Sequence, residues 1–202
     1  MKLYAFPLAP NPRKVIVYLK EKGIDLPIQQ VDLMTGENRT PEFLKKNPMG
    51  GLPVLELDDG SHLSESLAIM RYLEELHPDP PMFGTTPLER ARVCELERIA
   101  EIGVLAATGA IFQNTSPMFA GRVKQSPEAA ETGRMRLANN LAVLDQKIGD
   151  KKFVAGDRPT VADCTLFAAL EFGAFVGAAP DPSLRNVGRW YGSFKSRPSA
   201  SA

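Results

Sequence analysis

The chain has 202 residues, and 44% of them are hydrophobic, which is enough to bury the core of one large domain or two small ones. Its 24 lysine and arginine residues are matched by 24 aspartate and glutamate residues, so no net charge attracts nucleic acid or an anionic membrane surface. We therefore expect a globular protein that recognises a small ligand through local groups, with neither a nucleic-acid nor a membrane partner.

The sequence carries no pattern of a targeting, membrane-spanning or metal-binding segment. Prolines interrupt the N-terminal region before a long apolar run forms, and the most apolar later stretch, residues 166–179, contains Glu171. Cys94 and Cys164 are the only cysteines and form no C-x-x-C pair, which favours two reduced, buried thiols and a cytoplasmic location. With only two histidines besides, no cluster has the spacing of metal ligands, and no metal is expected.

Residues 1–78 alternate between the period of a strand and that of a helix. The predicted segments are, in chain order, a strand at Lys2–Phe6, a helix at Arg13–Gly23, a strand at Pro27–Leu33, a short helix from Pro41, two short strands within Pro53–Leu63, and a helix at about Glu65–Leu76. Asp59-Gly60 supplies the hairpin turn between the two short strands. The order β-α-β-α-β-β-α predicts a small mixed sheet covered by helices.

Helical spacing replaces the strand pattern in the second half, so we expect a linker at residues 79–86 and an all-α domain at residues 87–202. Three apolar stripes indicate its helices: Leu88, Val93, Leu96, Ile99 and Ile102; Leu137, Leu141, Leu144 and Ile148; Leu184, Val187, Trp190, Tyr191 and Phe194. Thr160 and Asp163 have the spacing of a capping box, with Asp in place of the usual Glu or Gln. A further helix is therefore predicted to begin at Thr160.

Four strings, in this order along the chain, resemble strings of the cytosolic glutathione transferases: LYAFPLAPNPRKV, NPMGGLPVLEL, LSESLAIMRYLEE and GDRPTVADCTL. The similarity covers nearly the whole chain, and the N-terminal string is closest to those of the bacterial, theta-, phi- and nu-like members. The resemblance implies a thioredoxin-like α/β N-terminal domain and an all-α C-terminal domain. It also implies glutathione as co-substrate, a hydrophobic electrophile as second substrate, a homodimer and a role in detoxification.

The string SESLAI has a chemistry that suits one end of glutathione. It opens a helix, whose N-terminal N–H groups and positive dipole end attract a carboxylate, and Ser66 adds a hydroxyl donor. Glu65 would attract an ammonium group, so the pair Glu65 and Ser66 suits the γ-glutamyl end of glutathione. The alternative is that Ser64 or Ser66 only caps the helix.

The resemblance implies that two further segments bind glutathione, which is a tripeptide. The Leu52–Pro53 bond is expected to be cis, which turns the backbone N–H and C=O of Leu52 toward a peptide that pairs with it. Asn38 and Arg39 fall where related sequences hold the glycine carboxylate, although a solvated loop arginine is an equal alternative. Related sequences often carry Gln or Lys where this chain has Gly51, so one ligand contact is expected to be missing.

The bend FPLAPNPRKV contains no hydroxyl or thiol. A transferase must stabilise the glutathione thiolate, and in serine-type members the donor hydroxyl lies six residues before Val15, where this chain has Ala9. Asn11 offers an amide donor at the place where transferase-like disulfide reductases carry T-P-N, and we assign it the catalytic role. Hydrogen bonding of Asn11 to local backbone is the alternative, and the N–H of Arg13 is expected to add to the field at the sulfur.

Three functions remain open on the sequence. The first is a glutathione transferase whose activity is altered by Ala9. Five residues are proposed to line its electrophile site, and core packing is the alternative role for each of them: Leu8, Leu105, Thr108, Phe112 and Phe119. The second is glutathione-dependent disulfide reduction, which needs no catalytic cysteine. The third is a non-catalytic binding protein of the same fold.

Overall fold

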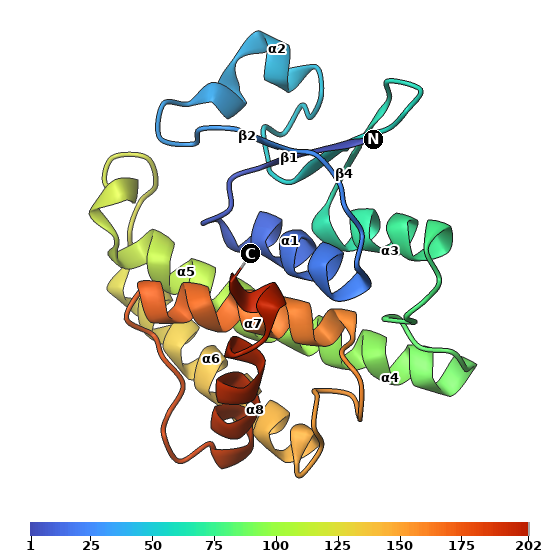
Figure 1. Ribbon diagram of the computed structural model, residues 1–202. Helices are drawn as coiled ribbons and strands as arrows, with labels where there is room; N and C mark the ends of the chain where they lie inside the picture. The colour runs from blue at the N-terminus through green and yellow to red at the C-terminus, as the bar shows by residue number, and fades with distance from the viewer. Residues whose placement is uncertain (202) are drawn as a thin grey trace. The chain divides into compact units, whose positions relative to one another are not determined.

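The computed structural model describes residues 1–201 and divides them into two compact units (Figure 1). The first unit contains Met1–Met82 together with the turn that begins at Pro198, and the second contains Phe83–Arg197. The boundary between the units falls within the predicted linker. Residues 198–201 belong with the first unit, whereas the sequence places them in the helical domain.

The first unit is built on a four-stranded sheet with the order β2-β1-β3-β4, in which only β1 and β2 are parallel. Its elements are β1 (Lys2–Ala5), α1 (Pro10–Lys22), β2 (Ile28–Gln30), the 3-10 turn η1 (Glu37–Arg39), α2 (Pro41–Leu44), β3 (Val54–Glu56), β4 (His62–Ser64), α3 (Ser66–Leu76) and the 3-10 turn η4 (Pro198–Ser201). Figure 1 shows α1 and α3 on one face of the sheet and α2 on the other. The predicted order β-α-β-α-β-β-α is confirmed.

Helix α1 begins at Pro10, three residues earlier than predicted, because proline fits the first turn of a helix, where its missing N–H has no acceptor. Residues 14–19 of the helix are all buried, so burial is not confined to one apolar face. It ends at Gly23, which has a φ of 69° and donates its N–H to the carbonyl of Lys20. Glycine adopts this left-handed conformation without a Cβ penalty, so the predicted end is confirmed.

A small core lies between the sheet and α2 and is formed by Tyr4, Val31, Phe43 and Val54. The hydroxyl of Tyr4 donates to Glu56 Oε2 over 2.6 Å. This hydrogen bond holds the pKa of Glu56 below its usual value. Tyr4 is therefore a structural residue.

A buried ion pair fastens the end of the first unit to its helices. The Nζ atom of Lys22 lies 2.9 Å from Glu74 Oε2 and donates to the carbonyl of Pro80 over 2.7 Å. The carboxylate of Glu74 also accepts the hydroxyl of Tyr18 and the N–H of Met82, each over 2.8 Å. Segment 80–82 is thereby attached to α1 through Lys22 and to α3 through Glu74.

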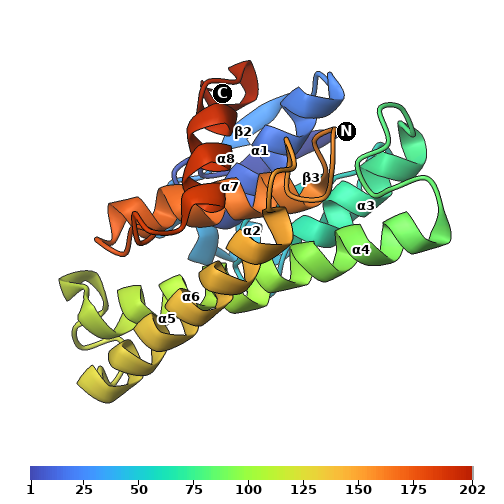
Figure 2. The same ribbon diagram turned by 90° about the horizontal axis from the view of Figure 1, so that it is seen from below.

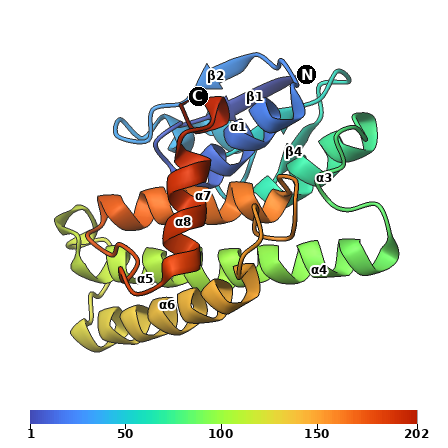
Figure 3. The ribbon, with the colours of Figure 1, turned by 60° about the horizontal axis from the view of Figure 1, so that its bottom comes forward.

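The second unit is all-α, as predicted. Its elements are α4 (Pro87–Arg98), the π-helical segment η2 (Ile99–Leu105), α5 (Ala106–Thr115), the 3-10 turn η3 (Pro117–Phe119), α6 (Pro127–Ile148), α7 (Val161–Phe175) and α8 (Arg185–Lys195). In Figures 2 and 3, α4, η2 and α5 follow one another as a single long rod with α6 alongside its second half. Helix α8 crosses α6 and α7 (Figure 3).

The first predicted stripe of the second unit is only partly correct. Leu88 and Ile102 are exposed and do not belong to the buried face. The buried face runs instead from Val93 through Ala100 and Val104. Leu96, a member of the predicted stripe, is also buried.

One of the two expected buried thiols is exposed. Both cysteines are free, and Cys164 is buried, whereas Cys94 lies on the exposed side of α4. Cys94 directly follows the buried Val93, and consecutive residues of a helix do not share a face.

Asp163 is a fully buried hydrogen-bond acceptor at the start of α7. Its carboxylate accepts the backbone N–H of Val154 over 2.9 Å, the N–H and hydroxyl of Thr160 over 2.9 and 2.8 Å, and the indole N–H of Trp190 over 2.8 Å. The predicted capping box is confirmed. Burial raises the pKa of Asp163 to about 6 against the opposing effect of these hydrogen bonds, so the group is ionised at neutral pH.

Candidate functional site

Three chain connections meet at one end of the sheet. Because Tyr4 of β1 pairs with Val54 of β3, and Val54 pairs with Ser64 of β4, both in antiparallel register, the end of β1, the start of β3 and the end of β4 share that edge. The bend before α1, the Leu52–Pro53 bond and Glu65 adjoin these three strand ends. The fold therefore brings together the predicted binding segments of the first unit.

Ala9 is the residue that precedes α1. Its N–H donates to the carbonyl of Phe6 over 2.9 Å, and its own carbonyl accepts the N–H of Arg13 over 3.0 Å. The N–H of Arg13 closes the first turn of the helix, so it can contribute to the field at a ligand sulfur only as part of the helix dipole. The methyl side chain of Ala9 offers no donor.

Asn11 is the only residue of Ala9–Pro12 whose side chain carries a hydrogen-bond donor. Pro10 and Pro12 are the first and third residues of the helix and have no N–H. Asn11 lies between them, is exposed, and within residues 1–201 neither its backbone N–H nor its side-chain amide has a hydrogen-bond partner. The alternative role for Asn11, bonding to local backbone, is not observed.

The Leu52–Pro53 peptide bond is cis, as expected. Pro53 is buried and directly precedes β3, whereas Leu52 is half-buried. Over the part of the chain that the structure describes, the N–H and C=O of Leu52 take part in no hydrogen bond. Both groups are available for main-chain pairing with an extended peptide.

Asn38 and Arg39 both hold the loop that precedes Leu52. The buried Asn38 donates its amide to the carbonyl of Gly50 over 2.7 Å, and the exposed Arg39 donates Nη1 to the carbonyl of Met49 over 2.9 Å. Gly50 has a φ of 62°, and a Cβ there would lie 2.8 Å from Arg39 Nη1 and from the carbonyl oxygen of Asn38. The loop therefore needs glycine at this position.

Asn47 supports the same loop and was not identified from the sequence. Its Oδ1 accepts the N–H of Met49 over 3.1 Å, and its Nδ2 donates to the carbonyl of Gly51 over 2.9 Å. An asparagine ahead of a proline and a glycine pair is typical of a turn, so the string NPMGG indicates a turn that begins at Asn47.

Glu65 and Ser66 begin α3 in an unusual backbone conformation. Glu65 is the only residue other than glycine with a positive φ in the described chain, at φ 73° and ψ 115°. Such a conformation costs about 1–3 kcal/mol and is found mostly at functional sites. Neither the exposed Glu65 nor the serines beside it cap the helix through a side chain, and Ser66 Oγ has no partner in residues 1–201. The capping alternative is therefore not observed.

The proposed wall residues differ in their exposure. Leu8, in the bend, is 85% exposed, and Phe112 of α5 is half-buried. Phe112 lies at the centre of an aromatic cluster and makes edge-to-face contacts with Phe119, Phe172 and Phe175. By contrast, Leu105 is almost completely buried.

Thr108 is fully buried in α5 of the second unit. Its hydroxyl donates to the carbonyl of Val104 over 2.9 Å. Its side chain therefore has a packing role within the helices, the alternative that the sequence left open for it.

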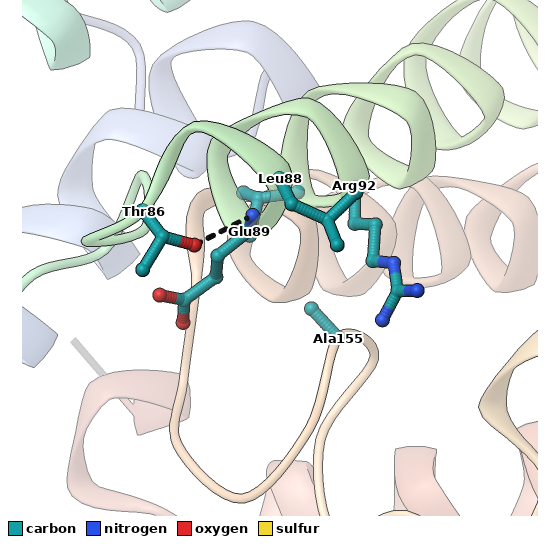
Figure 4. A pocket seen from close by; sticks show the side chains of 6 residues that line it. Thr86, Leu88, Glu89, Arg92 and Ala155 are labelled. Carbon is teal, nitrogen blue, oxygen red and sulfur yellow. Dashed lines mark hydrogen bonds between the residues drawn. The ribbon is translucent and has the colours of Figure 1, made fainter.

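A separate shallow pocket of about 180 Å³ lies in the second unit (Figure 4). It is lined by Thr86, Leu88, Glu89, Arg92, Val93 and Ala155. The hydroxyl of Thr86 accepts the N–H of Glu89 at the start of α4, and the carboxylate of Glu89 is bonded to Thr85 and Arg158. These polar groups stabilise the helix terminus and its neighbouring loop, so we assign no ligand to the pocket.

Residues 1–201 contain no group of three or more His, Cys, Asp and Glu side chains placed to hold a metal ion. In the same residues, no helix combines the length and the apolar character needed to cross a membrane.

Comparison with known proteins identifies the family. Residues 3–81 match the model of the glutathione S-transferase N-terminal domain, and residues 101–198 match the glutathione S-transferase C-terminal domain. Glutathione S-transferase 2 of Saccharomyces cerevisiae is 32% identical over 98% of this chain and 87% of its own length. Maleylacetoacetate isomerase of Pseudomonas aeruginosa is 35% identical over 89% of this chain and 86% of its own length.

Solved structures give the same result. A glutathione S-transferase domain-containing protein of Marinobacter aquaeolei superimposes with a TM-score of 0.91 at 35% identity, over 98% of this chain and 99% of its own. Gtt2 of Saccharomyces cerevisiae superimposes with a TM-score of 0.91 at 32% identity, over 100% of this chain and 99% of its own. With both family models matched and this fold, the chain belongs to the glutathione S-transferase family.

Proposed function

We propose that the protein binds glutathione at the end of the first unit's sheet and transfers its sulfur to a hydrophobic electrophile, with Asn11 as the donor that stabilises the thiolate. One observation carries the proposal. Within Ala9–Pro12, Asn11 is the only residue with a side-chain donor, since Ala9, Pro10 and Pro12 carry none, and this donor has no partner in residues 1–201.

The chemistry requires a lowered thiol pKa. Only the thiolate is a strong nucleophile, and lowering a thiol pKa by about two units corresponds to about 2.7 kcal/mol of preferential stabilisation. An amide N–H directed at the sulfur and the positive end of α1 both favour the negative charge. The thiol proton is released to solvent, the sulfur forms a bond to the electrophilic carbon, and the leaving group departs with its electron pair.

The other segments at the sheet end have groups that suit the rest of the tripeptide. The unpaired N–H and C=O of Leu52 suit the backbone of a cysteinyl residue. The Glu65 carboxylate suits an ammonium group, and the Ser66 hydroxyl at the start of α3 suits a carboxylate. Arg39 has further N–H donors besides the one bound to Met49, and these suit the glycine carboxylate.

The second substrate is proposed to be hydrophobic. Each unit supplies its own support, as apolar side chains that retain accessible surface: Leu8 in the bend of the first unit, and Phe112 with its aromatic neighbours in the second. Thr108 has no accessible surface and is not retained. Transfer to such compounds is the chemistry of detoxification.

Replacing Asn11 with alanine is expected to lower transferase activity toward an activated aryl halide at least about tenfold, since general stabilisation of a nucleophile by one donor is worth about that much or more. Asn11→Asp has the same shape but replaces the donor with a negative charge, so it should be at least as impaired. Ala9→Ser should raise the activity. Ultraviolet absorbance of the bound thiolate against pH would give the thiol pKa in each variant. Equal activity of Asn11→Ala and the unchanged protein would remove Asn11 from the mechanism.

Further assays on the purified protein distinguish the remaining two functions. A disulfide reductase would turn over a small mixed disulfide with glutathione after Cys94→Ser and Cys164→Ser. If glutathione binds and neither reaction exceeds the uncatalysed rate, the protein is a binding module. Absence of glutathione binding at millimolar concentration, measured by calorimetry, would contradict all three.

We further propose a cytoplasmic homodimer. Its support is the family membership together with exposed apolar side chains such as Leu76, Leu88, Ile102 and Met135, which a partner subunit would cover. Light scattering coupled to gel filtration should give twice the chain mass of 22.1 kDa. A single-chain mass at micromolar concentration would count against the dimer.

A further inference from the structure

The turn η4, which lies at the other end of the chain, packs against α1 within the first unit. Arg13 Nη2 donates to the carbonyl of Ala200 over 2.6 Å, and the Ser199 hydroxyl donates to the Glu21 carboxylate. Ser199 is only 3% exposed, so this turn is packed closely on the helix.

Arg13 joins this turn to the bend that carries the proposed chemistry. Its backbone N–H is bonded to the carbonyl of Ala9, while its side chain is bonded to Ala200. A shift of the η4 turn therefore acts through one residue on the position of Ala9. Asn11 lies between Ala9 and Arg13, inside this closed helical turn.

The bend has few N–H donors. Pro10 and Pro12 donate no hydrogen bonds, so the bonds from the N–H of Ala9 to Phe6 and from the N–H of Arg13 to Ala9 close this stretch, and the proline rings limit its backbone. The side chain of Asn11 adds none within residues 1–201. The bond from Arg13 to Ala200 is thus a side-chain contact that ties the first turn of α1 to a segment far along the chain.

We infer that residues 198–201 position the Ala9–Asn11 bend through Arg13, which makes Arg13 a positioning residue for the sulfur donor. The inference rests on the proposed function. Displacing a donor by about 1 Å can cost up to about a hundredfold in rate, whereas the groups proposed for binding, Leu52, Glu65 and Ser66, lie on other segments. Loss of the contact should therefore affect kcat and the thiol pKa, and leave the KM for glutathione nearly unchanged.

Two variants remove the contact from opposite sides. Arg13→Ala removes the donor. Pro198→Gly combined with Ser199→Ala loosens the turn and keeps the charge of Arg13. Each is expected to lower kcat about tenfold, to change the KM for glutathione less than about twofold, and to raise the pKa of the bound thiol by about one unit. Arg134→Ala, at an exposed arginine of α6, is the control and should change none of these.

Combining the two sets of substitutions tests whether they act through one contact. The variant that carries all three substitutions should have a kcat within about twofold of that of either parent variant, because the effects of substitutions at interacting sites are not additive. Full additivity would overturn the inference. It would also be overturned if Arg13→Ala raised the thiol pKa while the loosened turn did not, because Arg13 would then act through its charge.

A measurement without glutathione separates this inference from the proposed function. Amide hydrogen exchange at Ala9 and Arg13, followed by NMR, should be at least about tenfold faster in the loosened-turn variant than in Arg134→Ala. Faster exchange in a protein that does not bind glutathione would reject the proposed function and retain the structural role of Arg13. Unchanged hydrogen exchange at these two amides would overturn the inference whatever the activity. The test uses the variant with Pro198→Gly and Ser199→Ala, so it can still be made if Arg13→Ala fails to fold.

Discussion

Replacing Asp163 with alanine is expected to destabilise the second unit by about 4 kcal/mol or more. The carboxylate accepts four hydrogen bonds while fully buried, and its removal leaves donors of Val154, Thr160 and Trp190 without an acceptor. Each buried donor left unsatisfied costs about 1–3 kcal/mol, and the cavity of the lost side chain adds to this. Urea unfolding, followed by circular dichroism and by the fluorescence of Trp190, the only tryptophan, would measure the loss.

The isosteric variant Asp163→Asn separates shape from hydrogen bonding. Its carbonyl oxygen accepts two of the donors, but its NH₂ group faces the others, so we expect an intermediate loss of about 2 kcal/mol. Measurements should be made near about pH 8, because the pKa of Asp163 is raised to about 6 and the carboxylate is then ionised. If Asp163→Ala cost less than about 1 kcal/mol, the carboxylate would not be the central acceptor of this unit.

Replacing Glu74 with alanine is expected to destabilise the first unit by about 3–5 kcal/mol. Lys22 Nζ is fully buried and 2.9 Å from Glu74 Oε2, so its charge would lose this partner and keep its hydrogen bond to the carbonyl of Pro80. Breaking a buried ion pair by removing one partner has a cost of about this size. The N–H of Met82 would lose its acceptor as well. Urea unfolding monitored by circular dichroism would show the lowered midpoint.

The neighbouring Glu75 provides a matched control, since it is exposed on the same helix. Glu75→Ala should change stability by less than about 0.5 kcal/mol. Lys22→Met combined with Glu74→Gln removes both charges and should recover part of the loss, because an apolar replacement of a buried pair is often tolerated. Equal stabilities of Glu74→Ala and Glu75→Ala would contradict the role assigned to the pair.

Local patterns in the sequence were sufficient to predict the element order. Strand and helix periods, the stop at Gly23 and the hairpin at Asp59-Gly60 each depend on neighbouring residues, and the structure has all of them. The π-helical segment at Ile99–Leu105 and the exposure of Ile102 were not predictable in this way. They depend on which side of the helix meets its neighbours.

The site was predictable in its segments but not in its hydrogen bonds. The strings around Asn11, Leu52 and Glu65 indicated three connections, and the register of the strands places all three at one end of the sheet. Nothing in the sequence showed that the amide of Asn38 is used by Gly50 or that Asn11 is left without a partner. The bond from Arg13 to Ala200 joins residues 187 positions apart, a separation at which no short motif is informative.

The two prolines around Asn11 also make this position well suited to protein engineering. Pro10 and Pro12 fix the backbone of the first turn by their rings, and the side chain between them is bonded to no other part of residues 1–201. A designer is therefore free to install serine, cysteine or histidine at residue 11 with little risk to folding, and to change the reactivity of the bend through a single codon.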